Sequence, residues 1–520
     1  MGSLWPVEPH ENKKVVPMVL MMFLICFNYT LLRDLKDVLV LESMATSAIL
    51  YLKLVFTLPA SIIVMLVYTK MSLKMSKPNI FYSWMTFFVG FFALYGAVLY
   101  PLQDKIEPGD EWVSPYIKPS EQDIANAQKS GKPVLGDPNS TFPQFLAPVM
   151  MIVAHWSTAL LYVMSELWGS VVLSLLFWGY ANDICRTDEA KRFYTLFNIG
   201  ANFSLIFCGL ILITMGALSS DDKSKKSSGG DAMYLLMGLV CFFGCVIIGI
   251  YRWMQKNVLN DPRLCKQESE SGGKKKKVKL GFTEGLKVIF TSRYVFFIGV
   301  MVIMYGISVN FVEVYYKESW KNYFPNRGHK LMFTGSFSLG TGVVALCLLI
   351  FVGGKAVRGI GWTKTALISP VSIISVGIPF MGLFMLEKYF SFCPAAVLVA
   401  LGYIAVVISK SCKYSFFDPT KEMSFIPLGE DRGRAKAAVD VVGARLGKSG
   451  GGFLQIMLLA CFSTKEVGAI VEVLVALLVV MVGTWTYGTV SLGNLYNQKV
   501  KEQEEPLRSV ELGTATGTKA

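Results

Sequence analysis

Residues 233–254 read MYLLMGLVCFFGCVIIGIYRWM, an apolar run in which Arg252 is the one charged residue. Because a helix of about 20 apolar residues crosses the roughly 30 Å hydrocarbon core of a bilayer, this run predicts a transmembrane helix. Similar runs recur along the whole chain of 520 residues, which is 53% apolar and only 17% charged. Soluble domains average about 25% charged residues, so the sequence predicts an all-α polytopic membrane protein.

About twelve such spans can be placed, and a polar linker separates the first six from the last six. The expected spans are 16–38, 48–69, 79–102, 146–180, 193–217, 233–254, 294–316, 331–352, 365–386, 394–415, 435–461 and 467–489. The run at 146–180 is too long for one straight crossing, so we expect it to tilt, kink or project.

Six spans, a linker and six more spans are the plan of a major-facilitator-like transporter, which holds its solute between the two halves near the midplane. The expected domains are an N-terminal six-helix bundle (1–254), a basic linker (255–293), a C-terminal six-helix bundle (294–489) and a tail (490–520).

The lysine and arginine residues are distributed unevenly among the loops. With the N-terminus inside, the segments on the inner side hold most of the basic residues, which predicts that the linker and both termini are cytoplasmic. The acidic loop 103–145 is then external. A large part of the net charge of +13 comes from Lys274–Lys279, which we interpret as a tether to anionic lipid headgroups and not as a nucleic-acid site.

No metal or cofactor site is expected. The three histidines, His10, His155 and His329, show no metal-ligand spacing, and the ten cysteines include no CxxC pair. His155 lies in the fourth span and is interpreted as a packed core residue.

Several charged residues lie within the spans, where each costs about 2.5–3.5 kcal/mol at a helix centre, and such residues usually face a cavity or pair with each other. Lys53 precedes Pro59 in the second span and is expected to line a polar path along a kinked helix, with snorkelling to the interface as the alternative. Glu166 has no lysine or arginine within four residues, so its partner is expected from another helix or from the solute.

Glu313 ends the seventh span, and Lys317 follows it at i+4. An exposed structural pair between the two is the alternative to a role for Glu313 in transport. Lys410 and Lys413, near the end of the tenth span, are either cavity cations or charges of the cytoplasmic end.

Arg445 and Lys448 are three residues apart in the eleventh span and can point the same way along a helix. The run around them resembles a phosphate-binding loop of ATPases, but that motif requires glycine where Val442 stands, and no strand precedes it, so we reject an ATPase. The adjoining glycines favour close helix packing or local unwinding, with backbone NH groups near the two cations for phosphate.

A further cluster follows the first span. If that helix continues, Tyr29, Arg33, Lys36 and Asp37 share one face. An Arg33–Asp37 pair would then leave Lys36 free, and an ordinary loop start is the alternative. Cations on spans from both halves suit a polyanionic solute, while the two carboxylates suit charge balance or proton transfer.

These stretches resemble the ATP/ADP translocases, the nucleotide transporters of chlamydiae, rickettsiae and plastids. The matching strings are FNYTLLRDLKD (27–37), YLKLVFTLP (51–59), SELWGSVVLSLLFWGYAN (165–182), EAKRFYTLFNIGAN (189–202), YGISVNFVEV (305–314), SKSCKYSFFDPTKEMSFIPL (409–428) and DVVGARLGKSGG (440–451). They follow one another through nearly the whole membrane domain.

The resemblance implies four charged residues essential for transport, which fall on Lys53, Glu166, Glu313 and Lys448. It implies an ATP/ADP antiporter of a parasite or symbiont, in a bacterial inner membrane, that imports host ATP in exchange for ADP. Phosphate is a further possible substrate, the bilayer the other partner, and a monomer the expected functional state. Lys53, Lys448, Arg445 and Lys36 would hold phosphates, and Tyr162 or Phe311 would stack on adenine.

Other members of the family leave alternatives open, namely a proton-coupled nucleoside-triphosphate importer and an exchanger of other nucleotides or NAD. The chain departs from common family patterns at Tyr315 and Tyr316 and in the loops 103–145 and 217–232, so the exact substrate is not fixed. A membrane enzyme acting on nucleotides is the alternative from another class, but the sequence offers no catalytic cluster.

Overall fold

The computed structural model describes residues 7–120, 123–124, 134–185, 187–221, 228–259, 282–321, 323–324, 326–391, 393–439 and 443–516. Within these ranges the regular structure is helical and contains no strand. Eleven helices of this part of the chain are long and apolar enough to cross a membrane. They are Asn12–Ser43, Ala48–Lys74, Lys77–Leu99, Trp156–Ile184, Arg192–Ser220, Ala232–Asn257, Arg293–Lys321, Arg327–Val352, Gly359–Phe390, Ala395–Gly429 and Val467–Glu502. The prediction of an all-α polytopic membrane protein is confirmed.

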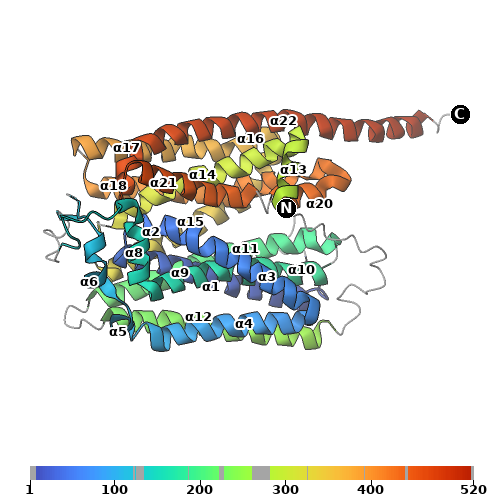
Figure 1. Ribbon diagram of the computed structural model, residues 1–520. Coiled ribbons are helices and arrows are strands. Elements are labelled where there is room, and N and C mark those ends of the chain that lie inside the picture. The colour runs from blue at the N-terminus through green and yellow to red at the C-terminus, as the bar shows by residue number, and fades with distance from the viewer. Residues whose placement is uncertain are drawn as a thin grey trace. The chain divides into compact units, whose positions relative to one another are not determined.

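The chain forms two compact units, shown in Figure 1. The first comprises the described residues within 1–274, 317–346 and 456–469, and the second those within 275–316, 347–455 and 470–520. Helix α14 (Arg293–Lys321) contributes to both, since the chain passes from the second unit to the first at Lys317. Helix α15 (Arg327–Leu348) lies almost wholly in the first unit.

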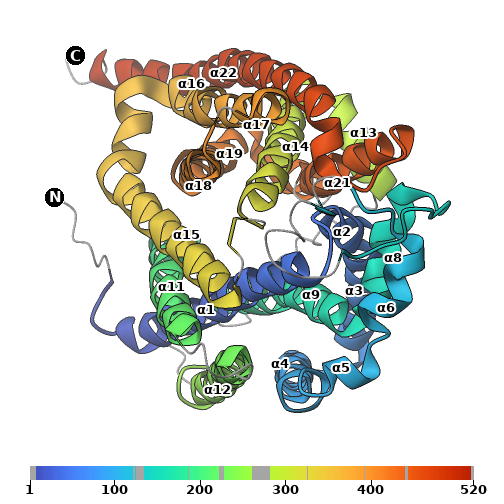
Figure 2. The same ribbon diagram turned by 90° about the vertical axis from the view of Figure 1, so that its left-hand side faces the viewer.

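The first unit is built around helix α1 (Asn12–Ser43), which packs against α9, α11 and α12 (Figure 2). In the most apolar 18-residue stretch of Asn12–Ser43, 67% of the residues are buried, compared with 22% in that of Ala48–Lys74. Helix α1 is therefore an inner helix. The other helices of this unit are α2 (Ala48–Tyr51), η1 (Leu52–Thr57), α3 (Leu58–Lys74), α4 (Lys77–Leu94), η2 (Tyr95–Leu99), α5 (Gln103–Ile106), α6 (Gly109–Val113), η3 (Ser114–Tyr116), η4 (Gln144–Leu146), α8 (Ala147–Ala154), α9 (Trp156–Trp168), η5 (Gly169–Phe177), α10 (Trp178–Ile184), α11 (Thr187–Asp221) and α12 (Ser228–Asn257).

Glycines bring α15 close to α11 within the first unit. A Cβ atom on Gly209 would lie 2.5 Å from the carbonyl oxygen of Gly335, and one on Gly216 would lie 2.5 Å from that of Gly328. These contacts need residues without a side chain, because small residues let helix backbones approach closely in membranes. The approach explains why α15 belongs to the first unit although it comes late in the chain.

In the second unit, α22 (Val471–Thr516) packs along α16 and α17, where Trp362 stacks on Tyr496 at 4.9 Å. The remaining helices are α13 (Phe282–Thr291), η7 (Leu349–Gly353), α16 (Gly354–Ser372), η8 (Ile373–Gly377), α17 (Ile378–Phe390), α18 (Ala395–Cys412), η9 (Lys413–Phe417), α19 (Asp418–Ser424), η10 (Ile426–Asp431), α20 (Arg432–Ala438), α21 (Ala444–Cys461) and η12 (Val467–Ile470). The end of α21 and nearly all of η12 belong to the first unit.

Widened π-helical turns interrupt several spans directly before a proline. The turn η1 precedes Pro59, η8 precedes Pro379 and η9 precedes Pro419. Proline lacks an N–H and its ring crowds the carbonyl four residues back, so the helix accommodates it with a wider turn. The expected irregularity of the second span at Pro59 therefore takes the form of a π-turn that contains Lys53, and such turns occur frequently at functional sites.

The structure refines two predicted spans, and in the first of them the expected kink is present. The long run at 146–180 is broken at His155, where α8 ends and α9 begins, because the backbone of this residue is not helical (φ −113°, ψ 47°). The predicted span 435–461 contains α20, which ends at Ala438, and α21, of which the apolar part is Ser449–Cys461. The charged residues and glycines before Ser449 lower the mean hydropathy of this region below that of the eleven long helices.

Candidate functional site

Helix α1 carries the charged segment 33–37 into the interior of the first unit. The predicted continuation of this helix is confirmed, since it ends only at Ser43. Lys36 is almost completely covered, at 2% exposure, and the side chain of Asp37 is 14% exposed. Two charged groups are thus buried on an apolar inner helix, where each must be neutralised by a neighbour.

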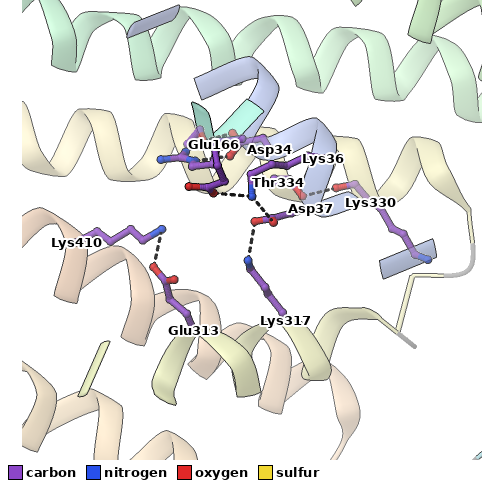
Figure 3. A network of polar contacts seen from close by, with 11 residues as sticks. Asp34, Lys36, Asp37, Glu166, Glu313, Lys317, Lys330, Thr334 and Lys410 are labelled. Atoms are coloured by element: carbon purple, nitrogen blue, oxygen red, sulfur yellow. Dashed lines mark hydrogen bonds and ion pairs between the residues drawn. The ribbon is translucent and has the colours of Figure 1, made fainter. Parts of the chain in front are cut away.

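Lys36 is surrounded by groups that stabilise its positive charge. Its Nζ lies 2.9 Å from Oε1 of Glu166 on α9 and 3.1 Å from Oδ1 of Asp37 (Figure 3). The same nitrogen lies 3.6 Å from the centre of the Tyr162 ring, a cation–π contact. The prediction that Glu166 finds its partner on another helix is confirmed. The prediction that Lys36 is left free is wrong, because the carboxylates of Glu166 and Asp37 bind it.

Asp37 joins Lys36 to a second lysine. Its Oδ2 lies 2.6 Å from Nζ of Lys317, on the part of α14 that belongs to the first unit. The charge of Lys53, on the π-turn η1, also acts favourably on Asp37. Three lysines therefore act on the cluster that contains the carboxylates of Asp37 and Glu166.

A second buried polar group lies one turn earlier on α1. Nε of Arg33 lies 2.9 Å from Oδ1 of Asp34, and its Nη2 donates to Oγ of Ser338 on α15 at 3.0 Å. Ser338 in turn donates a short hydrogen bond to Oδ2 of Asp34. The neighbour of Arg33 on its own helix is thus Asp34, and this group ties α1 to α15 within the first unit.

The second unit has ion pairs of its own. Oε1 of Glu313, on α14, lies 2.9 Å from Nζ of Lys410 on α18 (Figure 3). An exposed pair of Glu313 with Lys317 had been the structural alternative, but the side chains are only 19% and 11% exposed, and each binds an opposite charge from another helix. Lys413 binds Asp418 at 3.2 Å.

The structure describes the expected cations of the eleventh span only in part. Arg445 and Lys448 belong to α21, but their side chains lie outside the described part of the structure. The tether Lys274–Lys279 also lies outside the described residues. The aromatic candidates Tyr162 and Phe311 are fully buried at 0% exposure, so neither presents a ring face to a solute in this conformation.

Among the described residues, no group of three or more histidine, cysteine, aspartate or glutamate side chains is arranged to hold a metal ion. The ionic clusters instead consist of lysine or arginine with carboxylates. Such clusters can exchange one anion for another, since carboxylate and phosphate oxygens accept the same charge-assisted hydrogen bonds.

A third polar group lies at the break between α8 and α9. The ring nitrogens of His155 lie 3.1 Å from Oε2 of Glu107 and 3.2 Å from Oδ1 of Asp110. Burial lowers the pKa of His155, but the hydrogen bonds to Asp110 and Glu107 outweigh it and raise the pKa to about 9. Burial also raises the pKa of Glu107, but hydrogen bonds from His155 and Ser157 lower it overall. His155 is therefore a covered residue, as expected, and a charged one at neutral pH.

Sequence reasoning missed some partners in these groups. Asp34, Ser338 and the contact of Lys317 with Asp37 were not predicted. The signal that could have pointed to Asp34 is the doubled pattern of a cation followed by aspartate, at 33–34 and again at 36–37. No local signal marks Ser338, because it is one of many serines on apolar helices.

Comparison with known proteins supplies the remaining findings. The sequence model of a family described as TLC ATP/ADP transporter matches residues 1–121 and 134–496. ADP,ATP carrier protein 1 of Chlamydia pneumoniae is 38% identical over 514 residues, covering 96% of this chain and 95% of that protein. ADP,ATP carrier protein 1 of Rickettsia bellii is 36% identical over 511 residues, with 96% and 97% covered. The chloroplastic ADP,ATP carrier protein 1 of Arabidopsis thaliana is 36% identical over 517 residues, with 96% and 77% covered.

One solved structure shares the fold. A bacterial homologue of the iron transporter ferroportin, in an inward-facing state, matches with a TM-score of 0.52 and 11% identity, covering 93% of this chain and 98% of that one. At this identity the likeness concerns the fold alone. It agrees with the all-α polytopic fold described above.

Proposed function

Because the chain belongs to the TLC ATP/ADP transporter family, we propose that it exchanges ATP for ADP across a membrane by alternating access. It is a transporter and not an enzyme. The proposal makes the buried lysines the groups that recognise the nucleotide phosphates.

The observation that carries this proposal is the burial of lysine charge on membrane-length helices. Lys36 is 2% exposed and is held by Glu166 at 2.9 Å and by Asp37 at 3.1 Å. Placing charges in an apolar helix bundle costs energy even when they are paired, so a pure stability role is poorly served by such a cluster. A cluster of lysines that two carboxylates neutralise suits a protein whose cargo is a polyanion that replaces those carboxylates.

The individual residues are assigned as follows in this proposal. Lys36, Lys53, Lys448 and Arg445 hold the phosphates, since lysine and arginine donate charge-assisted hydrogen bonds to phosphate oxygens. Glu166 and Glu313 neutralise the cations when the nucleotide leaves, which the ion pairs of Glu166 with Lys36 and of Glu313 with Lys410 support.

Arg33 is a further candidate for substrate binding. Its hydrogen bonds to Asp34 and Ser338 favour a role in orienting α1, so that a variant at this position also affects Lys36 on the next turn.

The setting of the protein is part of the proposal. We infer the inner membrane of a bacterium from the chlamydial and rickettsial relatives. Both termini are assigned to the cytoplasm because the segments on that side hold the excess of lysine and arginine. The functional protein is a monomer with two six-helix bundles, 1–254 and 294–489, joined by the basic linker 255–293 and followed by the tail 490–520. The bilayer is the other partner, and phosphate is a possible third substrate.

The test is transport by the purified protein in lipid vesicles. Uptake of labelled ATP is measured into vesicles that contain ADP, into empty vesicles, and into empty vesicles with an acidic exterior. We expect uptake only with internal nucleotide, because exchange requires a return substrate. Labelled NAD, tested in the same way, probes the range of substrates.

Protein-free vesicles and vesicles preloaded with AMP provide the controls. Strong uptake into empty vesicles driven by the acidic exterior would replace exchange by proton-coupled import, with Glu166 and Glu313 as the proton carriers. Absence of ATP uptake under all three conditions, with correct insertion verified, would reject nucleotide transport.

A further inference from the structure

The carboxylate of Asp37 bridges two lysines from different helices. One oxygen contacts Lys36 at 3.1 Å and the other contacts Lys317 at 2.6 Å, as the dashed lines in Figure 3 show. Each lysine therefore directs an ammonium group at the same small anionic group. A phosphate group presents its oxygens in much the same way, and lysine binds phosphate as a point charge with three donors.

The three side chains differ in how far they are covered. Lys36 is 2% exposed, whereas Lys317 and Asp37 are 11% and 14% exposed. The contact between Asp37 and Lys317 is therefore the less covered part of the group. The contact that must open first is the one between Asp37 and Lys317.

The charges around Asp37 also favour exchange of one anion for another. Lys36 and Lys317 contact the carboxylate directly, and Lys53 adds a third positive charge that acts on it. Lys36 keeps its contact with Glu166 at 2.9 Å if Asp37 moves away. A cluster left without Asp37 would hold an excess of positive charge in an apolar setting, and a phosphate group restores the balance.

We propose that Asp37 holds the place between Lys36 and Lys317 that a terminal phosphate of the nucleotide takes during transport. Lys317 is then a phosphate-binding residue, and Asp37 is a resident counter-anion that the substrate displaces and that returns when the substrate leaves. This inference rests on the proposed ATP/ADP exchange and adds a specific pair of residues to it. It also predicts a preference for nucleotides with more phosphates, because displacing Asp37 is compensated only by an anion that reaches both lysines.

The test measures dissociation constants of ATP, ADP and AMP for the purified full-length protein. The variants are Lys317→Gln, Asp37→Asn and the double variant. Lys317→Gln is expected to weaken ATP and ADP binding by about 10- to 100-fold, and AMP binding less, since it removes a charge-assisted bond to a terminal phosphate. Asp37→Asn is expected to tighten ATP binding, because the competing anion is gone.

The double variant separates the proposal from a purely structural ion pair. If Lys317 binds phosphate, the double variant keeps most of the loss seen in Lys317→Gln. If the pair only holds the helices together, removing both charges restores ATP affinity to within about twofold of the wild type, and the proposal is overturned. Weaker ATP binding by Asp37→Asn alone would overturn it as well, and this variant decides the matter if Lys317→Gln does not fold.

The first unit offers a matched control. Lys465 binds Asp123 at 2.7 Å, and their side chains are 8% and 43% exposed, so a covered lysine forms a lysine–aspartate pair outside the membrane spans. Lys465→Gln is expected to leave the nucleotide affinities within about twofold, and an equal loss there would show that breaking any such pair lowers affinity. The wild-type protein is measured first, and a wild type that binds no ATP rejects the proposed function itself. ATP binding by the wild type with unchanged affinity in Lys317→Gln rejects this inference alone.

Discussion

Replacing Lys36 with glutamine is the sharpest perturbation of the cluster on α1. The ammonium group contacts Glu166 at 2.9 Å and Asp37 at 3.1 Å. With an effective dielectric constant near 20, those distances correspond to gross attractions of about 6 and 5 kcal/mol. Most of each is offset by desolvation, and removing one partner of a buried pair costs about 3–5 kcal/mol because the other charge is left uncompensated.

Two structural details place the expected loss within that range. Glu166 is 25% exposed, so water stabilises part of its charge once Lys36 is gone and shifts the loss toward about 3 kcal/mol. The lost cation–π contact with Tyr162, at 3.6 Å, adds about 1–2 kcal/mol for a desolvated site. We therefore expect Lys36→Gln to be less stable than the wild type by roughly 4–5 kcal/mol.

The assay combines thermal unfolding of the purified protein with ATP/ADP exchange in vesicles. Lys36→Gln together with Glu166→Gln removes the charge of both partners and is expected to recover part of the stability but not the exchange activity. A single variant as stable as the wild type would refute the burial argument. A double variant that exchanges nucleotides at the wild-type rate would refute the assignment of Lys36 to the phosphates.

The other predictions concern separate parts of the chain. Lys53→Gln and Lys448→Gln are each expected to weaken nucleotide binding by about 1–3 kcal/mol, more for ATP than for AMP, and a change of less than twofold for all three nucleotides would contradict a phosphate role. Because the pKa of His155 is raised from 6.5 to about 9, its stabilising charge is complete below pH 6.5 and is lost as the pH rises through 9. The melting temperature should therefore fall over that interval, and His155→Gln should lack this pH-dependent loss. Deleting Lys274–Lys279 should leave vesicle transport intact, since each lysine contributes only about 1 kcal/mol of attraction to an anionic surface, and lost nucleotide binding would contradict that role.

The membrane architecture could be predicted from the sequence because hydropathy acts locally. A run such as 233–254 predicts a helix whatever its neighbours are, and the structure contains Ala232–Asn257 there. The break at His155 was not predictable in position, because it depends on Glu107 and Asp110 from a distant loop.

Part of the candidate site could be predicted from the sequence, because the cost of burying a charge can also be judged locally. The cost of burying charge marks Lys36 and Glu166 individually, and helical spacing shows that Glu166 needs a partner from elsewhere. Neither argument identifies which helix supplies that partner, because pairing across helices depends on packing. Lys317 shows this most clearly. Its position four residues after Glu313 suggested an ion pair with Glu313, whereas its observed contact is with Asp37.

The pattern of charges on α1 suggests why two such different pairings arise on one helix. A cation followed by aspartate occurs at 33–34 and again three residues later at 36–37, so equivalent residues of the two pairs lie close to one face of the helix. The first pair, Arg33 and Asp34, forms hydrogen bonds with Ser338, which is neutral and therefore adds no further charge. The second pair binds Glu166 and Lys317, which bring one more charge of each sign. If Asp37 leaves this second group, its lysines keep an excess of positive charge that an incoming anion neutralises, which is the property that a site for an exchanged anion requires.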